Sequence, residues 1–160
     1  MIERPIIFNG LTMNDQTKRS LMVSPYYFIA VRSVDGLWGS DIRYETHPIP
    51  SNHGERSGDV FYAGKTITLA GDIIARDLTT LRIGSRLMQE KFWDLQQYKL
   101  YFTLWGEVQS YVTCRVSQPL VITEEQATAD VKRRFTVALR ADNPRFYKAS
   151  DSSLLYPWMA

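Results

Sequence analysis

The sequence predicts a mainly β domain of the β-sandwich or barrel-like kind, with one packed α-helix at about residues 78–95 and a long extended loop at about residues 36–64. Two observations carry this prediction. Segments rich in aromatic and β-branched residues alternate between apolar and polar positions, which is typical of half-buried strands. One segment alone repeats its apolar residues at helical spacing. A chain of 160 residues has room for one such domain, which we expect over residues 1–147, followed by a C-terminal tail at residues 148–160.

Before the helix, strands are predicted where alternation is bounded by turn residues. The first spans residues 6–11 and contains an Asn9-Gly10 turn, and the second spans residues 26–34. The third, at residues 65–74, has one apolar and one polar face, as expected for a strand with one solvated side. Its apolar face carries Ile67, Leu69, Gly71 and Ile73 with Lys65 at the entry, and its polar face carries Thr66, Thr68 and Asp72.

The predicted helix follows this third strand directly. Asp77 precedes it as an N-cap, because its carboxylate can accept backbone amide protons at the positive helix end. Gly84 lies inside the helix, where it costs about 1 kcal/mol relative to alanine, and we interpret it as a point of close packing. The apolar stripe is formed by Leu78, Leu81, Leu87, Met88, Phe92 and Leu95.

Strand patterns return after the helix. We predict strands at residues 99–105, 111–116, 120–123 and 133–140, with Pro119 separating the second from the third. The residues that follow Tyr147 have the composition of a polar tail, which ends in a small apolar tip that contains Trp158.

The segment at residues 36–64 fits neither pattern. It holds both histidines, Pro48 and Pro50, and it is much longer than the median connection of about 4–6 residues. We interpret it as a functional loop or a projecting hairpin, which could add to a neighbouring chain by edge-strand pairing.

Composition limits the class of function. With 19 Lys and Arg against 17 Asp and Glu, the net charge is +2, which gives no basis for non-specific nucleic-acid binding. The single cysteine, Cys114, can form no internal disulfide and no four-thiolate zinc site. The sequence has neither an apolar run of membrane-spanning length nor a signal-peptide pattern. We expect no catalytic residue, no metal and no cofactor.

The two histidines have a chemical and a structural interpretation. His47 and His53, with Glu45 and Glu55 nearby, could bind a metal or act as an acid–base pair. Their spacing is not a helical ligand pattern and no cysteine lies near them, so polar turn residues are the favoured interpretation.

Two further groups have both a chemical and a structural interpretation. Cys114 lies in the middle of a predicted strand, where a buried core residue is favoured over a catalytic thiolate. The run Lys132-Arg133-Arg134 could bind single-stranded nucleic acid, but the acidic residues just upstream favour a charged strand entry.

Three blocks occur in order between about residues 5 and 147. They are Phe8-Asn9-Gly10-Leu11, residues 62–73 with the helix that follows, and residues 133–147, which end in Asp142-Asn143-Pro144-Arg145-Phe146-Tyr147. Together these blocks resemble the distal tail proteins of long-tailed, siphovirus-type bacteriophages, especially those that infect actinobacteria. The resemblance implies a tail-tube-type fold with a structural role and no enzymatic activity.

The resemblance also implies an assembly. Such proteins form a hexameric ring that joins the tail tube to the tail tip or baseplate, and DNA passes through the lumen without specific binding. The loop would be the arm that clasps the next subunit, with Trp38, His47, Ile49, His53 and Phe61 as candidate contacts. The protein would be made in the host cytoplasm and reside in the virion tail, with other tail proteins as partners and no membrane. Many relatives continue into a second β-sandwich domain, for which residues 148–160 are too few, so we expect either a minimal ring-only member or a tail-tube or other ring protein of the same fold.

Two other functions stay open. A tail-tube subunit of the same fold would stack its rings into a long polymer, which the sequence does not distinguish from a single ring. A β-rich enzyme or oligonucleotide-binding barrel would use the run at residues 132–134, and loss of salt-dependent binding in Lys132→Ala and Arg134→Ala variants would support it.

Overall fold

The computed structural model describes residues 4–39, 42–48, 55–103, 108–124 and 131–155. Its elements in chain order are β1 (Ile6–Phe8), β2 (Leu11–Met13), the 3-10 helix η1 (Gln16–Lys18), β3 (Tyr27–Asp35), β4 (Ile42–Pro48), β5 (Glu55–Tyr62), β6 (Lys65–Ala75), α1 (Leu78–Trp93), β7 (Tyr98–Thr103), β8 (Gln109–Glu124), β9 (Lys132–Ala141), β10 (Phe146–Lys148) and β11 (Leu154–Leu155).

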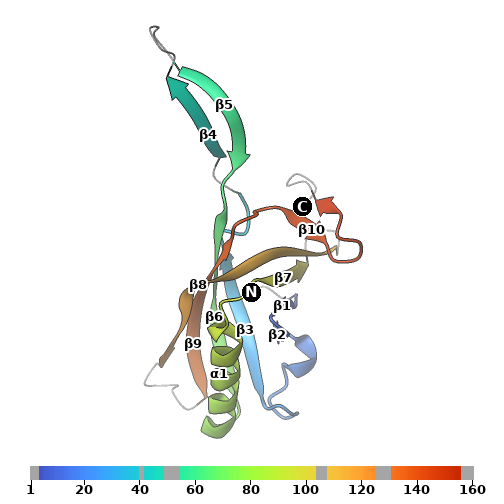
Figure 1. The fold of residues 1–160 in the computed structure, drawn as a ribbon. Helices are drawn as coiled ribbons and strands as arrows, with labels where there is room; N and C mark the ends of the chain where they lie inside the picture. Colours follow the sequence, from blue (N-terminus) through green and yellow to red (C-terminus); the bar gives the residue numbers. More distant parts are fainter. Residues whose placement is uncertain (1–3, 40–41, 49–54, 104–107, 125–130, 156–160) are drawn as a thin grey trace.

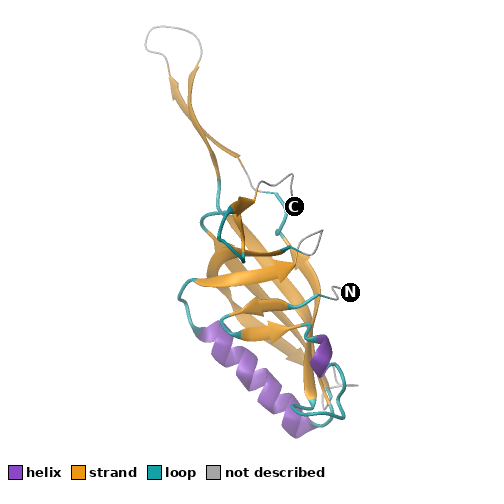
Figure 2. Cartoon of the chain, turned by 90° about the vertical axis from the view of Figure 1, so that its right-hand side faces the viewer, coloured by secondary structure: helices purple, strands orange, loops and turns teal. Residues whose placement is uncertain are grey.

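Nine strands form one antiparallel sheet that bends at β8 (Figures 1 and 2). The order along it is β2-β1-β7-β8-β9-β6-β3, and β10 joins β8 and carries β11. The N-terminal half of β8 pairs with β7, where Cys114 lies opposite Tyr98, and the C-terminal half pairs with β9, where Arg115 lies opposite Arg140. Strand β8 thus belongs to both layers that the bent sheet forms. The prediction of a mainly β fold with a helix is confirmed.

The prediction of two short strands around Pro119 is wrong, because β8 runs through this residue. The pairing of β8 with β9 shifts register between Val116 and Gln118 and again between Gln118 and Val121. Pro119 therefore falls within an irregular step of the ladder, where its missing N–H removes no regular hydrogen bond. A proline therefore does not end a strand here, because strands tolerate it at bulges.

The helix begins as predicted and ends two residues early. The Asp77 carboxylate accepts a hydrogen bond from the Thr80 amide at 2.9 Å, and the Thr80 hydroxyl accepts one from the Asp77 amide at 3.3 Å, which completes a capping box. Asp94 is extended, and its carboxylate accepts hydrogen bonds from the Gln96 amide and the Tyr98 hydroxyl. These bonds end the helix at Trp93, so Leu95 lies outside it and is exposed rather than part of the apolar stripe.

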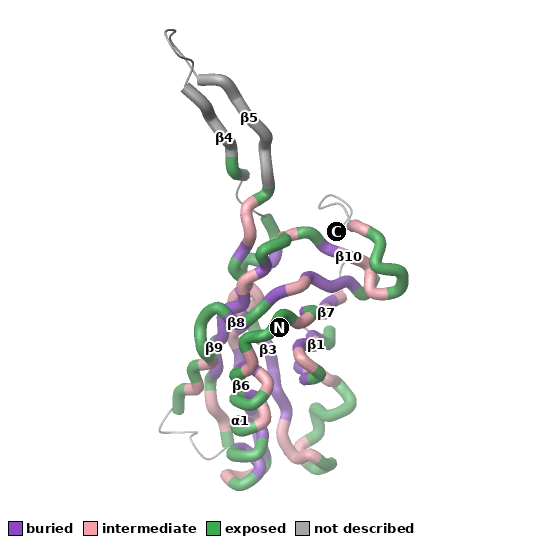
Figure 3. Tube along the Cα trace, in the orientation of Figure 1, coloured by how far each residue is buried: buried purple, intermediate pink, exposed green. Residues whose placement is uncertain are grey.

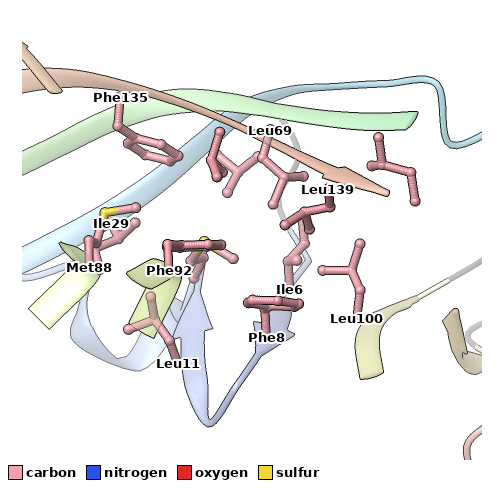
Figure 4. Close-up of a cluster of buried hydrophobic side chains, with 14 of the residues drawn as sticks. Ile6, Phe8, Leu11, Ile29, Leu69, Met88, Phe92, Leu100, Phe135 and Leu139 are labelled. Carbon is pink, nitrogen blue, oxygen red and sulfur yellow. The ribbon is translucent and has the colours of Figure 1, made fainter. Parts of the chain in front are cut away.

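The core lies between the two layers of the sheet and the inner face of α1 (Figures 3 and 4). The Phe8 ring stacks on Phe92 of the helix, with 5.2 Å between ring centroids, and the Tyr98 ring meets Phe8 edge-on. Gly84 packs closely, as predicted, since a Cβ there would lie 3.0 Å from the Tyr27 ring. Cys114 is buried as a core residue, also as predicted.

Asn14 connects the two ends of the sheet path. The backbone N–H of Asn14 donates to the Ile29 carbonyl at 2.9 Å. The side-chain oxygen of Asn14 accepts from the Val31 backbone N–H at 2.8 Å, and its side-chain nitrogen donates to the Val31 carbonyl. Because Asn14 directly follows β2 while Ile29 and Val31 belong to β3, these bonds join the first and last strands of the path. The buried side-chain amide thus adds two hydrogen bonds to the backbone bond between these end strands, where no regular strand pairing is present in the described residues.

An Asn14→Ala variant should lose about 2 kcal/mol or more of unfolding free energy. It leaves the buried Val31 amide and carbonyl without these side-chain partners, and it places alanine at a φ of 56°. The measurement is urea unfolding followed by far-ultraviolet circular dichroism. Asn143→Ala is the matched control, because this amide is exposed, and its loss should stay below about 1 kcal/mol. Equal losses in the two variants would contradict a closing role for Asn14.

Residues 146–155 contain two short paired strands, where the sequence predicts a polar tail after Tyr147. The strand β11 pairs with β10, with Leu155 opposite Phe146 and Leu154 opposite Tyr147, and β10 in turn pairs with β8. The tail prediction therefore needs correction up to Leu155, and the apolar tip with Trp158 lies outside the described residues.

Candidate assembly interface

The segment predicted as a long loop contains a β-hairpin. The strands β4 and β5 pair with each other from Ile42 opposite Tyr62 to Pro48 opposite Glu55, and they form a separate two-stranded sheet. The hairpin projects from the body of the domain (Figures 1 and 2). The loop prediction is thus wrong for these residues, and the alternative interpretation as a projecting hairpin is confirmed.

The hairpin strands pair with no other strand in the described part of the chain. Their outer edges carry backbone N–H and C=O groups that can accept a further strand. The seven residues of β4 span about 23 Å at the usual rise per residue, which is a large reach for a domain of this size. An isolated two-stranded hairpin is only marginally stable in water, so such a hairpin is typical of a segment that packs against a partner.

The five candidate arm residues have different positions relative to this hairpin. Trp38 lies at its root, half exposed, with its ring edge-on to Phe146 at 5.9 Å between centroids. The backbone of His47 lies in β4 opposite Arg56, and that of Phe61 lies in β5 opposite Arg43. Ile49 and His53 lie outside the described residues. The structure therefore places the backbones of three of the five on the hairpin or its root.

Two glycines at the root let the chain pass very close to β6 and β9. Gly36 has a φ of 75°, and a Cβ there would lie 2.0 Å from the Thr66 carbonyl oxygen. A Cβ on Gly64 would lie 2.8 Å from the Ala141 carbonyl oxygen. Both ends of the hairpin segment are thus held against the sheet where only glycine fits.

Lys65 is a buried cation at this root. Its Nζ donates to the Leu37 carbonyl at 2.8 Å and lies 3.7 Å from the centroid of the Phe146 ring. Burial lowers the pKa of the ammonium from 10.5 to about 8, and burial raises the pKa of the nearby Cys114 thiol to about 12. The ammonium thus connects three segments, namely the chain that leads into the hairpin, β6 and β10.

Sequence reasoning did not identify Lys65 as a core residue, although the signal was present. Lys65 has the same parity as Ile67 and Leu69, which places it on the buried face of its strand. Its exposed fraction is 6%, close to those of its apolar neighbours.

The polar face of β6 is less solvated than predicted. Asp72 is only 2% exposed, because the Arg32 guanidinium donates to its carboxylate and Lys132 Nζ lies 3.6 Å away. These cations come from the neighbouring strands β3 and β9. An aspartate between two cations on a sheet can be covered without an unpaired charge.

The basic run at residues 132–134 does not form a single patch. Because side chains alternate along β9, Lys132 reaches Asp72, whereas Arg133 pairs with Glu124 at 2.7 Å and contacts Ser85 of the helix. Charge at the strand entry is thus divided between the two faces of the sheet. This arrangement agrees with the favoured interpretation of the run as a charged strand entry.

Metal and thiol chemistry find little support in the described residues. No group of three or more His, Cys, Asp or Glu residues is placed to hold a metal ion there. The raised pKa keeps the buried Cys114 thiol protonated at neutral pH, which does not suit a nucleophile. No helix in the described ranges is long and apolar enough to cross a membrane.

The domain is thus a bent antiparallel sheet, closed over one helix, with a projecting hairpin. The same fold occurs in the crystal structure of the SPP1 Dit protein (gp 19.1), described as a paradigm of the hub adsorption apparatus in phages that infect Gram-positive bacteria. The two structures align with a TM-score of 0.60 and 12% sequence identity, over 91% of this chain and 52% of the Dit chain. This chain therefore spans about half the length of Dit, and the similarity to a phage distal tail protein is confirmed at the level of the fold. No protein-family model matches the sequence, and neither does any curated protein.

Proposed function

We propose that this protein is a non-catalytic structural subunit of a bacteriophage tail. In this proposal the subunits form a hexameric ring at the distal end of the tail, between the tail tube and the tail tip or baseplate. Each hairpin clasps the next subunit, and the DNA path runs through the lumen. The protein then belongs to the virion, needs no cofactor, and has other tail proteins as its partners.

The observation that carries the proposal is a hairpin without a partner on a Dit-like body. Within the described residues, β4 and β5 pack substantially only on each other, so their stability calls for a surface outside this chain. When a hairpin of one subunit meets the body of the next, the contact is heterologous, and it closes into a ring if the rotation permits. Stable interfaces of this kind bury about 2,000 Å² or more, which a projecting arm helps to supply.

Removal of the hairpin should abolish assembly without unfolding the body. Replacing residues 43–61 with a short Gly-Ser turn removes the outer edges while keeping Ile42 and Tyr62. Light scattering should give about six times 18.5 kDa for the wild type and the mass of one shortened subunit, below 18.5 kDa, for the variant, with circular dichroism unchanged apart from the lost strands. A Trp93→Ser variant at the exposed end of α1 is the control and should still assemble.

Electron microscopy of the wild type distinguishes the two tail functions. Separate rings support the distal tail position, whereas long tubes indicate a tail-tube subunit that stacks. A wild-type protein that remains a single subunit at every concentration, or a hairpin-deleted variant that still forms rings, would contradict a clasping arm.

A further inference from the structure

A cavity of about 180 Å³ lies at the root of the hairpin, beside Trp38. Its wall is largely apolar and comes from the N-terminal segment, the end of β3, β6 and the end of β7. Three of its residues, Ile6, Leu69 and Leu100, are seen in Figure 4. Among the described residues, the lining comprises Arg4, Pro5, Ile6, Val34, Leu37, Trp38, Leu69, Leu100, Phe102 and Thr103.

The size and chemistry of this cavity suit one aromatic side chain. An apolar cavity of about 150 Å³ in another protein binds benzene, so this one has room for a ring of indole size. Trp38 and Phe102 supply aromatic edges and faces, which favour offset or edge-on packing with a further ring.

The chain itself brings such a ring to this place. Leu155 lies opposite Phe146 in the β10–β11 pair, and the Phe146 ring lies 5.9 Å from Trp38 and 5.3 Å from Phe102 between centroids. The described chain thus ends beside the aromatic wall of the cavity. Trp158 follows three residues after Leu155, and an extended chain of that length reaches about 10 Å.

We propose that the indole of Trp158 occupies this cavity in its own chain. Burial of an indole removes a large apolar area from water and covers Trp38, which is 50% exposed in the described structure. The tether favours the same chain over a second copy, since a short linker holds the ring at a high effective concentration. The inference does not depend on ring assembly, because it concerns one subunit.

Fluorine NMR of protein labelled with 5-fluorotryptophan tests this docking. The Trp158 resonance is assigned from its loss in Trp158→Phe, and Trp93, which is 83% exposed, serves as the solvent-exposed reference within the same protein. The Trp158 resonance should lose most of the solvent isotope shift that Trp93 shows. An isotope shift equal to that of Trp93 in the wild type would overturn the proposal without any cavity variant.

A cavity-filling variant and a mixing experiment identify the occupied site. Val34→Phe fills the cavity from the partly buried end of β3 and should return Trp158 to the isotope shift of Trp93. Labelled Val34→Phe is then refolded together with unlabelled Trp158→Phe, whose cavity is open. If Trp158 of the blocked chain stays exposed, docking occurs within one chain; if it becomes protected, the occupant is a second copy and the proposal is wrong. Retained protection in Val34→Phe alone would place the ring elsewhere and also overturn it.

Discussion

A Gly71→Ala variant is expected to lose about 3 kcal/mol or more of unfolding free energy, because strand β3 cannot move away from the new methyl group without losing its ladder. A Cβ on Gly71 would lie 1.9 Å from the Ala30 carbonyl oxygen and 2.9 Å from the Val31 Cα, and both are backbone atoms. No side-chain rotation relieves such contacts. The measurement is urea unfolding, with the midpoint and its slope read separately.

Gly10→Ala is the matched control for this variant. Gly10 has a φ of 74°, a conformation that favours glycine and that Gly71 does not share, but a Cβ on Gly10 meets no atom within 4 Å. Its expected cost is therefore the backbone term alone, about 1–2 kcal/mol. If both variants lose the same amount, the close approach of β3 to β6 is not what requires glycine at position 71.

The strands of the body could be predicted because each has one buried face. The alternation of apolar and polar residues around Ile67 and Phe135 predicts that both side chains face the core, and both are buried. The strands β4 and β5 were predicted only as one of two alternatives, a projecting hairpin without bounds, because the sequence of residues 36–64 shows no regular apolar face. Their bounds follow from the pairing of the two hairpin strands with each other, which the apolar periodicity of a single strand does not indicate.

The candidate site was predicted as a region more than as a set of residues. The long segment at residues 36–64 was correctly identified as unusual, whereas Trp38 was named as a candidate arm contact through the family resemblance and its place at the root comes from the structure. The burial of Asp72 depends on which residues of β3 and β9 lie opposite it. The hydrogen bond from Lys65 to the Leu37 carbonyl depends on two chain segments that meet only in the folded structure. The apolar pattern of a single strand predicts neither of these two contacts.

The second large expected effect is the pH dependence of stability that Lys65 creates. The ammonium has a pKa of 10.5 in the unfolded chain and about 8 in the folded protein, because burial disfavours its charged form. Between these values the unfolded state binds more protons than the folded state, so the free energy of unfolding rises with pH. We expect a gain of about 1 kcal/mol between pH 8 and pH 9, within a full contribution of about 3 kcal/mol.

The Cys114 thiol acts in the opposite direction at higher pH. Its pKa is 9.0 in the unfolded chain and about 12 in the folded protein, so above about pH 9 the folded state binds more protons and stability falls. Tyr27 and Tyr98, whose pKa values are raised in the folded protein, add to this fall above about pH 10. The wild type should therefore pass through a maximum of stability between pH 9 and pH 10.

Two variants separate the contributions of the buried pair. Lys65→Met keeps most of the side-chain volume and removes the charge, so its stability should show no rise between pH 8 and pH 9. Cys114→Ala should keep that rise and lose much of the fall above pH 9. Urea unfolding at half-unit steps from pH 7 to pH 11 measures both slopes, and comparing slopes instead of absolute stabilities removes the effect of the cavity left by alanine. A rise that persists in Lys65→Met would assign the titration to another group, and the ammonium at the hairpin root would then carry no burial penalty in the folded protein.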